Sequence, residues 1–114
     1  MNVKRVKTNP ELKKMIDAFS KRKEKEYKLI GKYLSRPKRK SKPVNLSKIE
    51  KVSMDGDVVI VPGKVLAIGT LKKKLKIYAF SYSEACKRKI SSSGSEIHHI
   101  SDLLKDNIKG RLIV

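Results

Sequence analysis

The 114-residue chain is poor in several residue types, and each scarcity excludes a class of protein. It has one cysteine, so an intramolecular disulfide framework is excluded, and this fits a reducing cytosol. It has no tryptophan and six aromatic residues in all. No apolar run approaches the roughly 18 residues of a membrane-spanning helix. We also expect no secretory signal, because the charged N-terminus is not followed by an apolar segment.

Acidic residues are scarce as well, and the resulting charge is the strongest functional signal. The chain has 29 Lys and Arg against 11 Asp and Glu, a formal net charge of +18. Residues 1–51 hold 18 basic and five acidic residues, whereas residues 52–114 hold 11 and six. A small domain needs only about 2 to 8 charges for solubility, so the excess predicts a polyanionic partner. Nucleic acid is the leading candidate. An anionic membrane surface is second, because no helix face rich in Trp or Phe is present.

Two basic segments are predicted to contact phosphates. Residues 1–8 are interpreted as a basic, flexible arm, since they cannot bury enough apolar area to order themselves. In residues 36–43, five of eight residues are basic, and two prolines keep the backbone extended so that it can follow a phosphate ribbon. A frayed terminus and a solvated linker are the structural alternatives. The basic residues of the two segments are Lys4, Arg5, Lys7, Arg36, Lys38, Arg39, Lys40 and Lys42.

Residues 9–52 have helical patterning. Thr8 and Glu11 fit a capping box, and Pro10 suits the first turn of a helix. Two apolar stripes follow, with a break near Lys23, so two short helices are predicted. A second capping box at Ser47 opens a short helix to about residue 52. The stripes are Leu12, Met15, Ile16 and Phe19, then Tyr27, Ile30, Tyr33 and Leu34.

Residues 53–114 alternate between strand and helix signals. The β-branched run 58–61 predicts a buried strand that stops at Pro62-Gly63, and residues 75–80 predict a second strand. A capping box at Ser81 opens a helix that ends near Gly94, and residues 96–100 form a further strand. A helical turn at 101–104 and an edge strand at 111–114 complete the chain. The predicted fold is a small single α/β domain over residues 9–114, with N-terminal helices, a basic loop and a short, partly parallel sheet with a crossover helix.

The arrangements that could carry chemistry each fail a requirement. Gly63-Lys64 lacks the first glycine and the Ser or Thr of a phosphate-binding loop. Asp55-Gly-Asp57 is interpreted as a turn before a strand. His98 and His99 would point to opposite faces of a strand and cannot share a metal, and Cys86 is interpreted as a small core residue. We therefore expect no catalysis, no metal, no cofactor and no small-molecule substrate.

Three blocks of sequence, taken together and in order, resemble one known family. They are residues 32–49 (KYLSRPKRKSKPVNLSKI), 57–66 (DVVIVPGKVL) and 79–90 (AFSYSEACKRKI), followed by Gly94. The chain is similar to the archaeal and eukaryotic large-subunit ribosomal protein eighteen (L-eighteen-e) family, which is related to the C-terminal half of bacterial ribosomal protein L-fifteen. The resemblance covers about residues 8–105, and the short chain is similar to archaeal members. It departs from the pattern at Ser41, where another basic residue is expected, and at Ala67, where glycine is usual.

The resemblance implies a structural constituent of the large ribosomal subunit, located in the cytoplasm, that binds rRNA and neighbouring ribosomal proteins. Lysines outnumber arginines by 23 to 6, which favours contacts to phosphate over readout of bases. A DNA-coating, chromatin-type protein and an RNA-processing factor are the alternatives. The candidate rRNA-binding residues comprise the basic residues of the two segments above together with Lys48, Lys64, Lys72, Lys73 and Lys74.

Overall fold

The structure is a computed structural model, and it describes residues 10–35 and 43–114. The predicted flexible arm at residues 1–8, the Thr8 cap and the basic residues at 36–42 therefore lie outside the described residues. The chain divides into two compact units, residues 1–36 and 37–114, which are described one at a time.

The first unit is a pair of helices, α1 (Pro10–Ser20) and α2 (Lys25–Leu34), packed against each other. Both helices and the break near Lys23 confirm the predicted pattern. Phe19 and Tyr27 are buried and meet edge to face, with ring centroids 5.6 Å apart. The guanidinium of Arg22 lies 4.6 Å from the centre of the Tyr27 ring and is paired with Glu24 at 2.9 Å. This turn therefore ties the two helices together.

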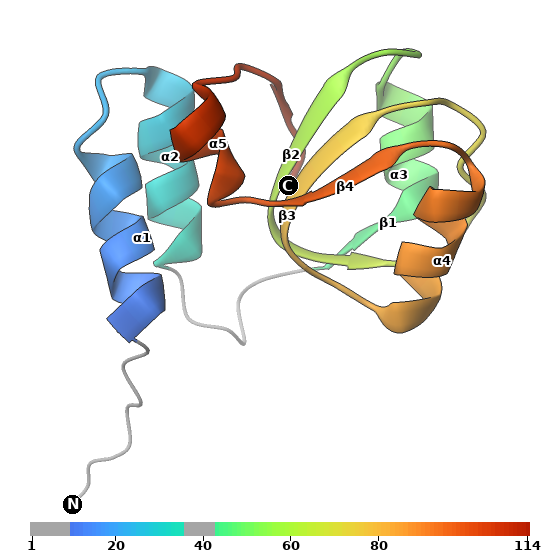
Figure 1. The fold of residues 1–114 in the computed structure, drawn as a ribbon, viewed down its shortest axis with the longest axis horizontal. Coiled ribbons are helices and arrows are strands. Elements are labelled where there is room, and N and C mark those ends of the chain that lie inside the picture. The colour runs from blue at the N-terminus through green and yellow to red at the C-terminus, as the bar shows by residue number, and fades with distance from the viewer. Residues whose placement is uncertain (1–9, 36–42) are drawn as a thin grey trace, which may run out of the picture. The chain divides into compact units, whose positions relative to one another are not determined.

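The second unit is a parallel sheet with three helices (Figure 1). The strands β1 (Val44–Asn45), β2 (Val58–Leu66), β3 (Lys76–Tyr82) and β4 (Glu96–His99) lie side by side in that order. A fifth strand, β5 (Arg111–Leu112), pairs with β2, and all the pairings are parallel. The helices are α3 (Leu46–Val52), α4 (Glu84–Ser92) and α5 (Asp102–Asp106). The predicted α/β fold, including the β3–α4–β4 crossover, is confirmed.

The main core of the second unit lies between one face of the sheet and the helices α3 and α4. Val59 and Ile77 are register partners on β2 and β3, as are Val61 and Ala79, and all four side chains are buried in this core. Alternation along the strands puts Ile60 and Tyr78 on the opposite face, where they are also buried. A strand buried on both faces needs a continuous apolar run, which is what β2 has. The helices and remaining segments contribute Val44, Leu46, Ile49, Val65, Leu71, Leu75, Cys86, Ile90 and Ile113 to the core.

The expectation that β2 stops at Pro62-Gly63 is wrong. β2 continues to Leu66, and the register with β3 shifts between Val61 and Lys64, where one extra residue forms a bulge. On the other edge of β2, β5 pairs with residues 59–60 and β1 with residues 65–66. Proline has no N–H to donate, and a bulge that leaves residues 62 and 63 out of the ladder accommodates it without losing a hydrogen bond.

Two of the predicted capping boxes are also wrong. The N-cap of α4 is Ser83, whose side chain accepts from the Cys86 amide, because β3 extends through Ser81 to Tyr82 before the helix begins. The N-cap of α3 is Asn45, two residues before Ser47. The Glu50 carboxylate does not turn back to the helix start but binds a loop 22 residues further along the chain. In the first case the extension of β3 moves the helix start by two residues, and in the second a contact with a distant loop replaces the local one.

Candidate nucleic-acid interface

The predicted interface is only partly within the described residues. Eight of the 13 candidate residues lie in segments 1–9 and 36–42, outside the described residues. The other five are in the second unit: Lys48 on α3, Lys64 on β2, and Lys72, Lys73 and Lys74 in the loop between β2 and β3.

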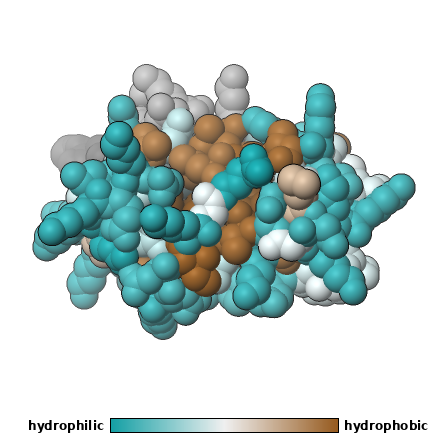
Figure 2. All heavy atoms as spheres, turned by 90° about the horizontal axis from the view of Figure 1, so that it is seen from above, coloured by the Kyte–Doolittle hydropathy of each residue, from teal (hydrophilic) through white to brown (hydrophobic). Residues whose placement is uncertain are grey.

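Helix α3 and the loop 67–75 run side by side and in the same direction. At the start, the Ser47 amide donates to the carbonyl of Ile68 at 3.0 Å. Further along, the Lys72 amide donates to Glu50 Oε1 at 2.9 Å. At the end, Lys73 Nζ reaches the carbonyl of Ser53 at 2.5 Å. We call this pair of segments the α3–loop surface. On the one face that Figure 2 shows, both hydrophilic and hydrophobic side chains reach the surface, and the hydrophilic ones project furthest.

Two carboxylates hold the loop backbone in place. Glu50 Oε1 accepts from the amides of Lys72 and Lys73, and Asp55 Oδ1 accepts from the amide of Lys74 at 2.6 Å. The hydrogen bond from the Lys72 amide is the largest of the effects that lower the pKa of Glu50 below its ordinary value. These bonds satisfy three successive backbone donors, so the lysine-rich loop has a fixed backbone from which its side chains project.

The three consecutive lysines of the loop differ in what their ammonium groups contact. Lys73 Nζ donates to the carbonyls of Glu50 and Ser53, at 2.6 and 2.5 Å, and lies 3.9 Å from the Glu50 carboxylate. Lys72 and Lys74 are exposed, and neither forms an ion pair with any residue in the described ranges. Lys73 therefore fastens the loop to α3, whereas Lys72 and Lys74 have ammonium groups available to an anion.

On α3, the exposed lysines lie three residues apart. Lys48 and Lys51 are one turn apart on the outer face of the helix, and both are exposed. Lys48 Nζ donates one hydrogen bond, to a backbone oxygen of Val114 at 2.5 Å, which leaves two of its three N–H groups for another partner. Sequence reasoning missed Lys51, although its spacing from Lys48 was the signal that could have found it. Together with Lys72 and Lys74, these residues make the α3–loop surface strongly cationic.

Lys64 is in a different place, at the bulge of β2. It is exposed, and the parallel register pairs Val44 with Val65, which puts Pro43 at the level of Lys64. Pro43 directly follows the basic segment 36–42, so Lys64 lies beside the point where the chain passes from that segment to the sheet. Lys64 comes six positions after Val58 along β2, about 20 Å at the rise of a strand. Because Val58 pairs with Lys76, Lys64 and the lysines at 72–74 are at opposite ends of the sheet.

Comparison with known proteins gives the family. No family model matches the chain. "Large ribosomal subunit protein eL18" of Archaeoglobus fulgidus is 39% identical over 108 residues, which cover 91% of this chain and 92% of that protein. The protein of the same name from Nanoarchaeum equitans is 41% identical over 101 residues, covering 87% and 86% of the two chains. The chain belongs to the eL18 family. The resemblance seen in the sequence blocks is confirmed, and the length of these matches means that the eL18 relatives extend over both units.

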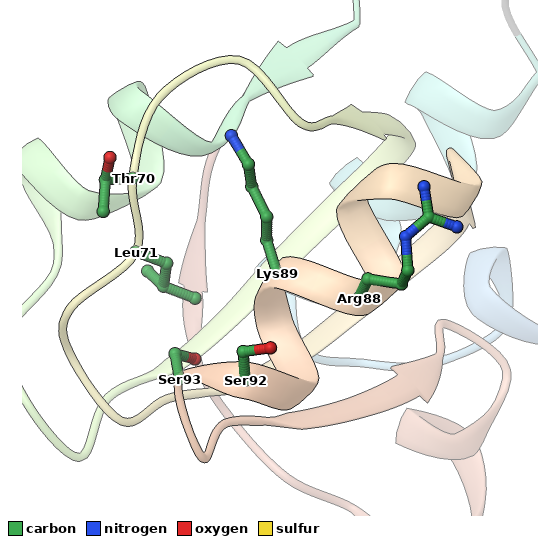
Figure 3. Close-up of a pocket in the computed structure, with 6 residues that line it drawn as sticks. All are labelled: Thr70, Leu71, Arg88, Lys89, Ser92 and Ser93. Carbon is green, nitrogen blue, oxygen red and sulfur yellow. The ribbon is translucent and has the colours of Figure 1, made fainter.

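A shallow hollow of about 300 Å³ borders the α3–loop surface in this member of the eL18 family (Figure 3). It lies between the loop and α4. Lys89 extends from α4 to the loop, where its Nζ donates to the carbonyls of Ala67 and Gly69 at 2.7 and 2.8 Å, whereas Arg88 points away from the loop. The loop is thus fastened on both sides by a lysine. The lining residues are Thr70, Leu71, Arg88, Lys89, Ser92 and Ser93.

The residues considered for catalysis or metal binding have structural contacts in this eL18 chain. Cys86 is fully buried, and burial raises the pKa of its thiol to about 11. His98 stacks on Tyr78 and contacts Glu96 at 2.9 Å, whereas His99 contacts the hydroxyl of Ser101. Within the described ranges, no group of three or more His, Cys, Asp or Glu side chains could hold a metal. Nor does any described helix have the length and apolar character to cross a membrane.

The Asp55–Asp57 turn is confirmed as turn chemistry. Gly56 has a positive φ of 91°, which favours glycine, and the amide of Met54 donates to Asp57 Oδ2 at 2.8 Å. Asp57 Oδ2 also lies 3.4 Å from Arg111 Nε, which connects the turn to β5. The two carboxylates therefore have separate partners.

Proposed function

We propose that the chain is a structural constituent of the large ribosomal subunit and binds rRNA mainly through its phosphate backbone. The observation that carries the proposal is the match to relatives named as large-subunit ribosomal proteins over about nine-tenths of the chain. The excess of positive charge supports it, because a polyanion is the partner that relieves such self-repulsion.

The basic segment 36–42 is proposed as the main phosphate contact, since it combines the highest local charge with no apolar anchor. Lys64 lies where this segment joins the sheet and extends its contact area. The α3–loop surface supplies a second group of cations, of which Lys73 acts by holding the loop. The proposed rRNA-binding residues are Lys4, Arg5, Lys7, Arg36, Lys38, Arg39, Lys40, Lys42, Lys48, Lys51, Lys64, Lys72 and Lys74.

The proposed partners are large-subunit rRNA and neighbouring ribosomal proteins, with the chain located in cytoplasmic ribosomes. The proposed role is that of a scaffold and not of an enzyme. The fixed backbone of the loop supports rRNA binding, because lysines held on an ordered backbone lose less entropy on binding a shaped surface such as structured RNA.

A salt series with purified large-subunit rRNA tests the proposal. Replacing the five basic residues of 36–42 by Gln should reduce the slope of log K against log salt by about 4, at roughly 0.7 to 0.9 per phosphate. A matched control replaces five exposed lysines elsewhere by Gln and should change the salt slope by much less. An equal change in both variants would contradict the assignment of this segment. The control lysines are Lys13, Lys14, Lys21, Lys105 and Lys109.

Duplex DNA of the same length, measured at the same salt, separates the proposal from a DNA-coating protein. The proposal expects tighter binding to rRNA than to duplex DNA, since structured RNA is recognised by shape and 2′-hydroxyl groups. Equal affinity for both would support a chromatin-type protein instead.

A further inference from the structure

Helix α2 has two faces of opposite character. Its inner face is made by Tyr27, Ile30, Gly31 and Leu34, all buried. At 100° per residue, the side directly opposite comprises Lys25, Lys28, Leu29 and Lys32, and all four are exposed. The outer face is therefore three lysines around one leucine, and Leu29 is 43% exposed.

The cations of this outer face are not neutralised by nearby acids. Lys25, Lys28 and Lys32 form no ion pair with residues 10–35 or 43–114. Of the two glutamates nearby, Glu24 stands four residues before Lys28 but is bound to Arg22 at 2.9 Å, and Glu26 lies to the side of the face. The positive charge of this face is thus available to a partner.

Helix α1 provides the contrast. Its exposed lysines Lys13 and Lys14, and Lys21 directly after its end, surround Asp17 at spacings of four, three and four residues, the spacings at which side chains on a helix are neighbours. The outer face of α1 therefore has mixed charge and is typical of a solvated helix. The outer face of α2 has Leu29 where α1 has an acid.

The spacing of the three lysines suits a polyanion with regularly placed charges. Along the helix axis, Lys25 and Lys28 are about 4.5 Å apart, and Lys28 and Lys32 about 6 Å apart. Flexible lysine side chains at this spacing can meet successive phosphates of one strand, each neutralised phosphate releasing counterions. Leu29 in the centre offers an apolar contact for ribose carbons between those phosphates.

We infer that the outer face of α2, formed by Lys25, Lys28, Leu29 and Lys32, is a second binding surface for the RNA backbone. The inference rests on the proposed function and extends it: the helical unit and the sheet unit each bind rRNA. They are joined by the basic segment 36–42, so binding of one unit raises the effective concentration of the other at its own site. The chain is then bivalent for rRNA.

The test compares two triple variants of the full chain with large-subunit rRNA. Lys25→Gln/Lys28→Gln/Lys32→Gln should reduce the salt slope by about 2, since three phosphate contacts contribute roughly 0.7 to 0.9 each. Glutamine is a good helix former, so the thermal midpoint should be unchanged. The control, Lys13→Gln/Lys14→Gln/Lys21→Gln, removes the same charge and should change the slope by less than about 1.

Three outcomes separate the inference from the proposed function. Equal slopes for the two triple variants would overturn the inference, while the proposed function would still stand if the 36–42 variant loses binding. A wild-type chain that binds duplex DNA as tightly as rRNA would overturn the proposed function itself. If the α2 variant binds rRNA normally but no longer enters assembled subunits, the face contacts a protein, and the RNA assignment is wrong.

Discussion

Replacing Lys73 by methionine should lower the stability of the protein without removing a phosphate contact. Methionine keeps the length and apolar character of the side chain but removes the ammonium that donates to the carbonyls of Glu50 and Ser53. A hydrogen bond from a charged group contributes about 1.5 to 3 kcal/mol when buried. The Lys73 side chain is 31% exposed, so we discount the two bonds together to about 1 to 2 kcal/mol.

Urea unfolding followed by circular dichroism measures this loss. For a unit of the size of residues 37–114, about 1 kcal/mol also corresponds to a shift of roughly 4 to 8 °C in the midpoint of thermal unfolding. Lys72→Met and Lys74→Met are matched controls, because they change the same residue type in the same loop at exposed positions. Each should alter stability by less than about 0.5 kcal/mol.

In the rRNA-binding assay, replacing Lys72 and Lys74 should have the larger effect and replacing Lys73 the smaller one, the reverse of their effects on stability. Removing Lys72 and Lys74 together should reduce the salt slope by about 1.4 to 1.8, whereas Lys73→Met should leave it nearly unchanged once binding is measured well below the midpoint of unfolding. If Lys73→Met reduces the salt slope and spares stability, the division of the three lysines between loop anchoring and phosphate binding is refuted.

Four further predictions concern local contacts. Ser83→Ala should lower the free energy of unfolding by about 1 kcal/mol, because it removes the N-cap of α4. Ser81→Ala should lower it by less than about 0.5 kcal/mol, and equal losses in the two variants would contradict the assignment of the cap to Ser83. Gly69→Ala should cost at least about 2 kcal/mol, because φ is 103° and a Cβ would lie 2.6 Å from α3, so a loss below about 0.5 in urea unfolding contradicts this packing. Cys86 should react with thiol reagents only on unfolding, since burial raises its pKa to about 11, and rapid native-state labelling would contradict its burial. The lowered pKa of Glu50 gives stability that is present above its unfolded pKa and lost as pH falls through its folded pKa. The advantage of wild type over Glu50→Gln should therefore shrink progressively as the pH falls below about 4.5, and a constant difference in unfolding midpoint would contradict this.

Much of the fold was predictable from patterns within single elements. The stripes of α1 and α2 repeat every three to four residues, and the run 58–61 is too continuous for a half-exposed strand. Both patterns are set by which faces of a single helix or strand are buried, so they can be recognised within the element itself. The three sequence blocks at 32–49, 57–66 and 79–90 indicate the family from sequence alone.

The errors arose where a long-range contact overrode a local preference. Ser47 and Glu50 have the spacing of a capping box, but the loop amides of residues 72 and 73 bind the Glu50 carboxylate instead. Pro62-Gly63 has the composition of a turn, but pairing with β3 carries the strand past it as a bulge. No sequence window around residue 50 or residue 62 contains the partner that decides its conformation.

The candidate site was predictable as a charge distribution but not as a set of contacts. Lys72, Lys73 and Lys74 are equivalent in sequence, and only the position of α3 directs the middle ammonium inward. Lys51 stands beside Glu50 in the sequence, and only the fold turns the Glu50 carboxylate toward the loop while Lys51 stays exposed.

Sedimentation of the native protein through a sucrose gradient tests the central claim most directly. Cell extract is separated at low salt, and the chain is detected in each fraction by an antibody. A structural constituent of the large subunit should travel with large-subunit rRNA and return to the top of the gradient when the rRNA is digested. If the chain stays at the top of the gradient while intact subunits sediment, the proposed function is wrong.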